Sequence, residues 1–210
     1  MFVWVALGVA LIDWSAVYLG RARLEALAKP LVLISLIVAV VDAGPTSIDW
    51  LVVGGLALSL AGDILLLPAV DRFLTGLAAF LAAHIVYVVA FVAEWTIGEP
   101  QARVLLAVGC ALALVLWGLI GRRIISASEG AGANMRKAVQ VYVLILSAMM
   151  IAGFGVGSAL LALGALLFAL SDGVLGWNRF VAPMIHGRLA THVLYHLGQI
   201  LIAAWAVNLI

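Results

Sequence analysis

Two aspartates lie inside long apolar stretches, where a carboxyl group is costly to place. Asp63 lies within the stretch LALSLAGDILLLP, and Asp172 follows the run LLALGALLFALS. A charge at the centre of a membrane helix costs roughly 2.5–3.5 kcal/mol on insertion scales, so such residues usually face a bundle interior or a wet cavity. Desolvation and mutual repulsion keep two carboxyl groups in one low-dielectric cavity from ionising together. A protonated acid beside a carboxylate suits acid-catalysed hydrolysis through an oxocarbenium-like state.

The composition indicates the medium that surrounds these acids. Of the 210 residues, 67% are apolar and only 10% are charged, and the mean hydropathy is +1.27. Soluble domains have about 45–50% apolar and about 25% charged residues, so we expect an integral membrane protein. The apolar runs have helix length and no period of two, which argues against a lipid-facing β-barrel. The net charge of +1 and the absence of a basic run predict no nucleic acid partner.

Hydrophobic stretches predict an all-α protein with eight transmembrane helices in one domain, residues 1–210. The stretches cover about residues 2–20, 30–43, 49–67, 73–93, 103–121, 138–154, 158–176 and 188–209. Most approach the ~20 residues that cross a bilayer. The second is short and is expected to extend through Leu24 and Leu27, with Pro30 in a first helical turn. Residues 122–137 read as the only real linker, because Gly, Ser and Asn lie in its middle.

The basic residues predict the orientation of the helices. Ten of the eleven Lys and Arg residues fall in or beside the odd-numbered connections, whereas the other side of the bundle has only Arg103 together with four acidic residues. Cytoplasmic loops carry the excess of Lys and Arg, so the odd-numbered connections should be cytoplasmic and both termini non-cytoplasmic. We expect a multi-pass protein of a bacterial inner membrane.

The two halves of the chain, about 1–98 and 99–210, carry the same polar residues in the same order. Each half has a lysine, an aspartate 34 or 35 residues later, a histidine 21 or 20 residues after that, and a tyrosine three residues further on. The two series are Lys29, Asp63, His84 and Tyr87, then Lys137, Asp172, His192 and Tyr195. Four helices per half give both halves one orientation, so we expect a parallel repeat about an axis along the membrane normal.

Both aspartates should lie near the cytoplasmic surface. Asp63 precedes Arg72 by nine residues and Asp172 precedes Arg179 by seven, so at ~1.5 Å per residue each carboxyl group is on the order of 10 Å deep. Other polar groups are expected to meet them in one cavity open to the cytosol. These are Lys29, His84, Tyr87, Thr191, His192, Tyr195 and Gln199. Asp13, at similar depth, either lines the same cavity or pairs with a nearby base.

Simpler interpretations exist for the same residues. The aspartates could pair with Lys29 and Lys137 only to fix the register of the helices, and His84 could be a structural hydrogen-bonding group. A protein with buried acids in repeated helices could also be a proton-coupled transporter of a small molecule or lipid. His192 and His196 are spaced for a metal, but there is no HExxH pattern and no cofactor signature, so we expect neither a metal nor a cofactor.

The segment GDILLLP…RFLTGLAAFLAAHIVYVVAF resembles the YhhN family of membrane proteins, which is related to the animal lysoplasmalogenases. Lys29-Pro30, Met135-Arg136…Tyr142, Ser171-Asp172 and Tyr195…Gln199 are also similar to the family pattern, whereas GVLGWNRFVAPMIHGR is less well matched. The resemblance implies hydrolysis of the vinyl ether bond of lysoplasmalogens, a class of lysophospholipid. The products are a fatty aldehyde and glycerophosphoethanolamine or glycerophosphocholine.

The resemblance also implies that Asp63 and Asp172 are catalytic. Vinyl ether cleavage begins with protonation of the carbon–carbon double bond, and water then attacks the resulting oxocarbenium ion. Asp172, in an apolar run beside Ser171, is the preferred acid. Either Lys29 or His84 could hold the other carboxylate ionised. The substrate chain would lie among the surrounding apolar helices, in contact with membrane lipid.

Overall fold

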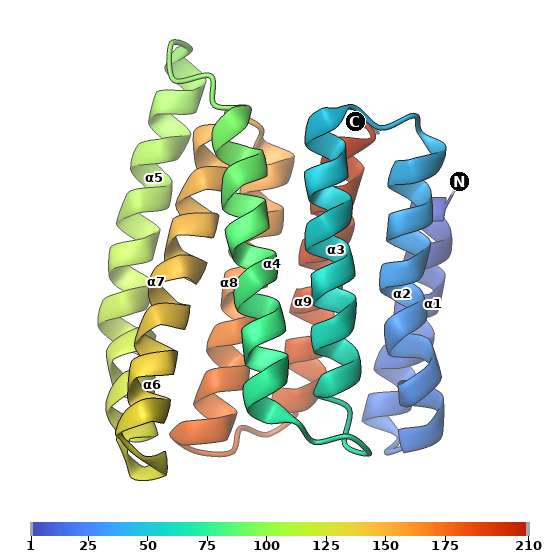
Figure 1. Cartoon of the computed structure of the whole chain (residues 1–210), viewed down its shortest axis with the longest axis vertical. Helices are drawn as coiled ribbons and strands as arrows, with labels where there is room; N and C mark the ends of the chain where they lie inside the picture. The colour runs from blue at the N-terminus through green and yellow to red at the C-terminus, as the bar shows by residue number, and fades with distance from the viewer. Residues whose placement is uncertain (1, 209–210) are drawn as a thin grey trace.

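The computed structural model describes residues 2–208, and all regular secondary structure in that range is helical (Figure 1). The α-helices are α1 Phe2–Tyr18, α2 Ala22–Asp42, α3 Ser47–Leu65, α4 Phe73–Ala93, α5 Pro100–Leu116, α6 Arg122–Ser128, α7 Ala133–Gly155, α8 Ala159–Phe180 and α9 Gly187–Ala206. A π-helix, Trp117–Gly121, joins α5 to α6, and a short 3₁₀ turn, Glu129–Ala131, follows α6. Residues 100–131 therefore form one continuous helical segment.

Seven helical segments of the described chain are long and apolar enough to cross a membrane, and α1 is apolar but has only 17 residues. Large apolar side chains lie on the outer surface of the bundle, where Leu114 is 72% and Trp4 is 66% exposed. Such a surface is compatible with lipid rather than with water. The protein is therefore an all-α integral membrane protein.

The basic residues gather at one end of the bundle. The connections α1–α2, α3–α4, α6–α7 and α8–α9 all lie at the lower end of Figure 1. Ten of the eleven Lys and Arg residues lie in these connections or within about two helical turns of them. We call this the basic end. It is the end at which α3 stops and α9 starts, so it places polar residues of these helices near each other.

Two local predictions were wrong. Helix α2 begins at Ala22, so Pro30 lies inside the helix rather than in its first turn. The expected extension of this helix through Leu24 and Leu27 is confirmed, and it begins still earlier because Glu25 and Lys29 are buried against the bundle. Residues 122–137 are helical too, apart from a break at Gly132, whose φ of +106° favours glycine. Their Gly and Ser content suggested a longer loop than the packing allows.

Small residues let α8 and α9 approach closely. A Cβ atom added to Gly198 would lie 2.9 Å from the carbonyl oxygen of Gly164 and 2.9 Å from the backbone nitrogen of Phe168. Glycine at such positions brings helix backbones into contact, which is how many membrane helices associate. This contact fixes Asp172 on α8 relative to the polar face of α9.

We predict that Gly198→Ala destabilises the protein by about 1–3 kcal/mol, the usual cost of overpacking. The methyl group would meet backbone atoms, which cannot move away as a flexible side chain can. Gly8→Ala in α1 is the matched control, because nothing lies within 4 Å of its added Cβ. It should be neutral or slightly stabilising, since alanine favours helix. Thermal unfolding in detergent measures both, and equal stability of the two variants would contradict the prediction.

An aromatic cluster lies beneath the polar residues of the basic end. Phe80 of α4 contacts Tyr195 of α9 edge-on, with ring centroids 5.7 Å apart, and Phe168 of α8 contacts both rings. Tyr87 packs against Phe168 on the side away from the basic end. Edge-to-face pairs of this kind hold rings in fixed orientations. The cluster thus forms a rigid base for the side chains above it.

Candidate active site

A cavity of about 150 Å³ lies at the basic end, between α2, α3, α8 and α9. Both Asp63 and Asp172 border it. The complete lining is Glu25, Lys29, Asp63, Leu66, Pro68, Phe80, Ser171, Asp172, Leu175, Asn178, Arg188, Thr191, His192 and Tyr195. The cavity therefore combines charged groups with apolar walls, which is typical of a small-molecule site.

Asp63 has a cationic partner. It lies near the end of α3, and its Oδ1 is 3.1 Å from Nζ of Lys29 on α2. The hydroxyl of Tyr195 on α9 donates to its Oδ2 at 2.8 Å. The aspartate side chain is only 1% exposed and that of Lys29 11%. The ammonium group and the hydroxyl donor both favour the ionised form of this carboxyl group.

Asp172 has different partners. The hydroxyl of Tyr142 on α7 donates to its Oδ2 at 2.6 Å, and the Ser171 hydroxyl lies 3.4 Å from its Oδ1. The nearest basic group is His84 of α4, whose Nε2 is 3.5 Å from Oδ2. Within residues 2–208 no lysine or arginine forms a salt bridge with Asp172. The two aspartates of the cavity thus differ in the charge that faces them.

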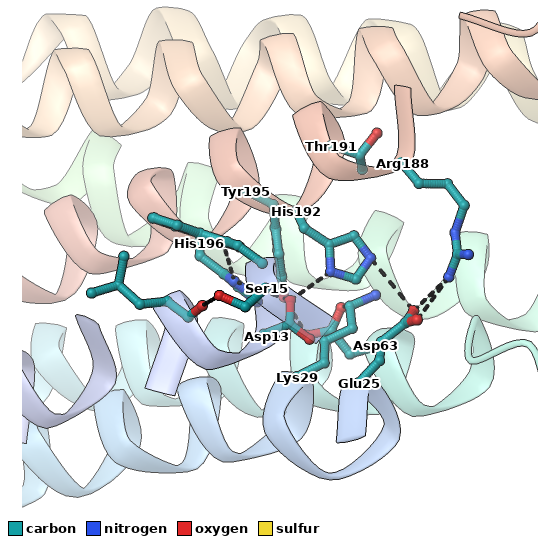
Figure 2. A network of polar contacts seen from close by, with 12 residues as sticks. Asp13, Ser15, Glu25, Lys29, Asp63, Arg188, Thr191, His192, Tyr195 and His196 are labelled. Carbon is teal, nitrogen blue, oxygen red and sulfur yellow. Dashed lines mark hydrogen bonds and ion pairs between the residues drawn. The ribbon is translucent and has the colours of Figure 1, made fainter. Parts of the chain in front are cut away.

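A second polar network borders the cavity along α1, α2 and α9 (Figure 2). Asp13 is fully buried, and its Oδ2 lies 2.7 Å from Nδ1 of His192. The other ring nitrogen of His192 points to Glu25, 3.8 Å away. Glu25 in turn accepts two hydrogen bonds from one guanidinium nitrogen of Arg188, at 2.7 and 2.9 Å. Of the two alternatives for Asp13, the structure therefore supports pairing with a base.

Three other residues expected in the cavity lie behind it. The Tyr87 hydroxyl donates to Oε1 of Gln199 at 2.8 Å, and both side chains are fully buried. His84 is fully buried as well, and among the described residues neither of its ring nitrogens has a hydrogen-bond partner. Tyr87 and Gln199 support the aromatic cluster, whereas His84 stands behind Asp172.

The sequence matches an established family. The profile of the YhhN family matches residues 24–206. This chain belongs to the YhhN family. It is 37% identical to human lysoplasmalogenase TMEM86B over 156 residues, which are 74% of this chain and 62% of that protein. The lysoplasmalogenase TMEM86B of Sus scrofa is 35% identical over 181 residues, 85% of this chain and 73% of that protein.

A bacterial relative is similar as well. The membrane protein YhhN of Escherichia coli is 31% identical over 121 residues, 55% of this chain and 58% of that protein. No solved structure matches this member of the YhhN family significantly. The match to the human protein covers about three fifths of that protein's length.

The structure of this YhhN family member brings together most of the residues that the sequence singled out. Lys29, Asp63, Ser171, Asp172, His192 and Tyr195 all border the cavity, and Tyr142 contacts Asp172 from behind. Sequence reasoning did not include Glu25, and it left Arg188 without a role. Glu25 precedes Lys29 by four residues, which places both on one helix face. This spacing becomes informative only when α2 is known to begin at Ala22, because both residues then belong to the same helix.

Lys29 and Lys137 hold matching positions in the two halves of the sequence, but the structure gives them different surroundings. Lys29 forms the salt bridge with Asp63. Lys137, its counterpart in the second half, is exposed and forms no salt bridge in the described part of the chain. Tyr142 occupies the position next to Asp172 instead. Register pinning by two lysine–aspartate pairs is therefore excluded as the common role of these acids.

Proposed function

We propose that this YhhN family protein is a membrane-embedded ether hydrolase. It cleaves the vinyl ether bond of lysoplasmalogens to a fatty aldehyde and a glycerophospho head group. One observation carries the proposal: two aspartates border a single cavity, one beside an ammonium group and the other beside neutral donors. Relatives named lysoplasmalogenase support the choice of substrate.

Asp172 is the acid in this proposal. Without a lysine or arginine beside it, a buried carboxyl group is more stable as the neutral form. Its proton goes to the vinyl carbon remote from the ether oxygen, which leaves an oxocarbenium ion on the adjacent carbon and oxygen. Tyr142 donates to the carboxylate that remains, so it stabilises the charge formed in this step.

Asp63 supports the second half of the reaction. Its carboxylate, held ionised by Lys29, stabilises the positive charge of the oxocarbenium ion and orients water toward it. Water adds to the carbon that carries the oxygen and gives a hemiacetal. Collapse of the hemiacetal releases the aldehyde and the glycerol hydroxyl, and the proton lost by the water restores Asp172. The balance consumes one water and requires no cofactor.

We further propose that all eight long helical segments cross the membrane, with the basic end in the cytoplasm of a bacterium and both termini outside. The 17 residues of α1 reach the lower limit of a spanning helix. The two halves, about 1–98 and 99–210, are parallel repeats. In support, each aspartate is met by a residue of the other half: Tyr195 contacts Asp63, and His84 lies beside Asp172.

The deciding experiment uses purified protein and lysoplasmenyl ethanolamine in detergent micelles. We expect fatty aldehyde and glycerophosphoethanolamine in equal amounts, measured by mass spectrometry. In deuterated water the aldehyde should carry one solvent deuterium next to its carbonyl carbon, because the acid protonates that carbon. The saturated alkyl-ether lysolipid is the matched control and should remain intact. Proton-driven flux in proteoliposomes without aldehyde would instead identify a transporter.

A further inference from the structure

A second cavity lies on the other side of Asp172, between α4, α5, α7 and α8. Its walls include Leu77, Ala113, Trp117, Leu146, Met150 and Ala169. We call it the apolar slot. The hydroxyl of Ser147, which also borders it, donates to the carbonyl oxygen of Val143 at 2.8 Å and is thus satisfied within its own helix. Walls of this kind suit a hydrocarbon rather than a polar group.

The apolar slot and the polar cavity meet at Asp172. Asp172 and Leu175 border both of them. Tyr142, the donor to Asp172, lines the slot side. A molecule with a polar head and an apolar chain can therefore place its head beside Lys29 and Arg188 and its chain in the slot. The bond between head and chain then lies next to Asp172.

The length of the slot matches one membrane leaflet. Along α7 the slot extends from Val139 to Met150, eleven residues apart, or about 16 Å at ~1.5 Å per residue. The hydrocarbon core of a bilayer is about 30 Å thick, so the chains of one leaflet reach about 15 Å. Met150 and Ala113 lie at the part of the slot farthest from the basic end. A chain there has the direction of a lipid chain in that leaflet.

The backbone of the slot is unusual on one side. The π-helix Trp117–Gly121 contributes Trp117, Ile120 and Gly121 to the wall. A π-helical turn inserts one extra residue into a helix and turns the side chains that follow, and such turns are frequent at functional sites. Here Trp117, Ile120 and Gly121 of the turn all border the slot.

We propose that the apolar slot binds the alkyl chain of the lysoplasmalogen and that its deep end, at Ala113 and Met150, limits the chain length. The inference rests on the proposed hydrolase for the identity of the ligand. The vinyl ether, which joins chain to head group, is then placed beside Asp172, at the junction of the two cavities. The head group and the chain are both bound at a distance from the reacting bond, and their binding orients that bond.

The first test changes the deep end. Ala113 is 7% exposed and faces the slot, so Ala113→Phe should shorten it. We expect kcat/KM for a long-chain lysoplasmenyl ethanolamine to fall at least about tenfold relative to a short-chain one, as for crowding in other apolar pockets. Ala111→Phe, on the exposed face of the same helix, is the control and should leave the ratio unchanged. Equal loss with both chain lengths would overturn the proposal.

The second test does not depend on hydrolysis. The probe is a saturated alkyl-ether lysolipid with a diazirine at the end of its chain, photolysed on the wild-type protein in vesicles of phosphatidylcholine. We expect adducts on Ala113, Leu146 or Met150, and competition by unlabelled alkyl-ether lysolipid. A diazirine-labelled phosphatidylcholine is the control for bulk lipid and should label outward residues such as Leu114. Adducts of both probes on outward residues alone would overturn the slot, even where aldehyde release is found.

Discussion

Asp172→Asn is expected to lower the rate of aldehyde release by roughly 10²–10⁴-fold, the usual contribution of a positioned general acid. The amide has nearly the shape of the carboxyl group, and its oxygen can still accept the hydrogen bond from Tyr142. The variant lacks only the acidic proton. The rate should be measured by mass spectrometry at saturating lysoplasmenyl ethanolamine, with folding followed by thermal unfolding.

Glu129→Gln is the matched control for this substitution. Glu129 also lies at the basic end and pairs with Arg136 at 3.0 Å, but its side chain is 62% exposed and does not border the cavity. Its loss should change neither activity nor stability appreciably, because an exposed salt bridge contributes little. If Asp172→Asn released aldehyde at the wild-type rate, Asp172 would not be the acid.

Lys29→Met is expected to destabilise the protein by about 3 kcal/mol or more, because it leaves a buried carboxylate without its cation. Asp63 is 1% exposed, and Lys29 is its salt-bridge partner. Tyr195 still donates to the carboxylate, but a hydroxyl group cannot replace a full charge. Aldehyde release should also fall, since the carboxylate is then no longer held ionised. Unfolding titrations in detergent measure the first effect.

A double variant separates the two consequences of removing Lys29. In Lys29→Met/Asp63→Asn no unpaired charge remains, so most of the lost stability should return. Activity should not return, because the carboxylate that stabilises the oxocarbenium ion is absent. A double variant as unstable as Lys29→Met would indicate that the lysine acts through packing of its methylene chain instead.

The positions of the long helices could be predicted from apolar runs, because the bilayer sets their length. The expectation of a common depth for Asp63 and Asp172 rests on their distances to Arg72 and Arg179 along the chain. Sequence spacing measures height along the membrane normal, which is why both acids were expected at one level. Their place at one cavity agrees with that expectation.

Rotation of the helices about their own axes could not be predicted. It decides that Tyr142, rather than Lys137, contacts Asp172, although the two are only five residues apart on α7. It also decides that Asp13 contacts His192, 179 residues away. These contacts depend on which helices are neighbours. The sequence pattern within one helix does not show which other helices pack against it.

The crossed contacts of the two acids have a consequence for the chain as a whole. Asp63 on α3 receives its hydroxyl donor from α9, and Asp172 on α8 has its histidine neighbour from α4. In the proposed reaction, each half of the chain therefore supplies a neighbour for the aspartate that the other half carries. A substitution at Tyr195 or His84 is then expected to affect the aspartate of the opposite half, so neither half is expected to be active when it is expressed alone.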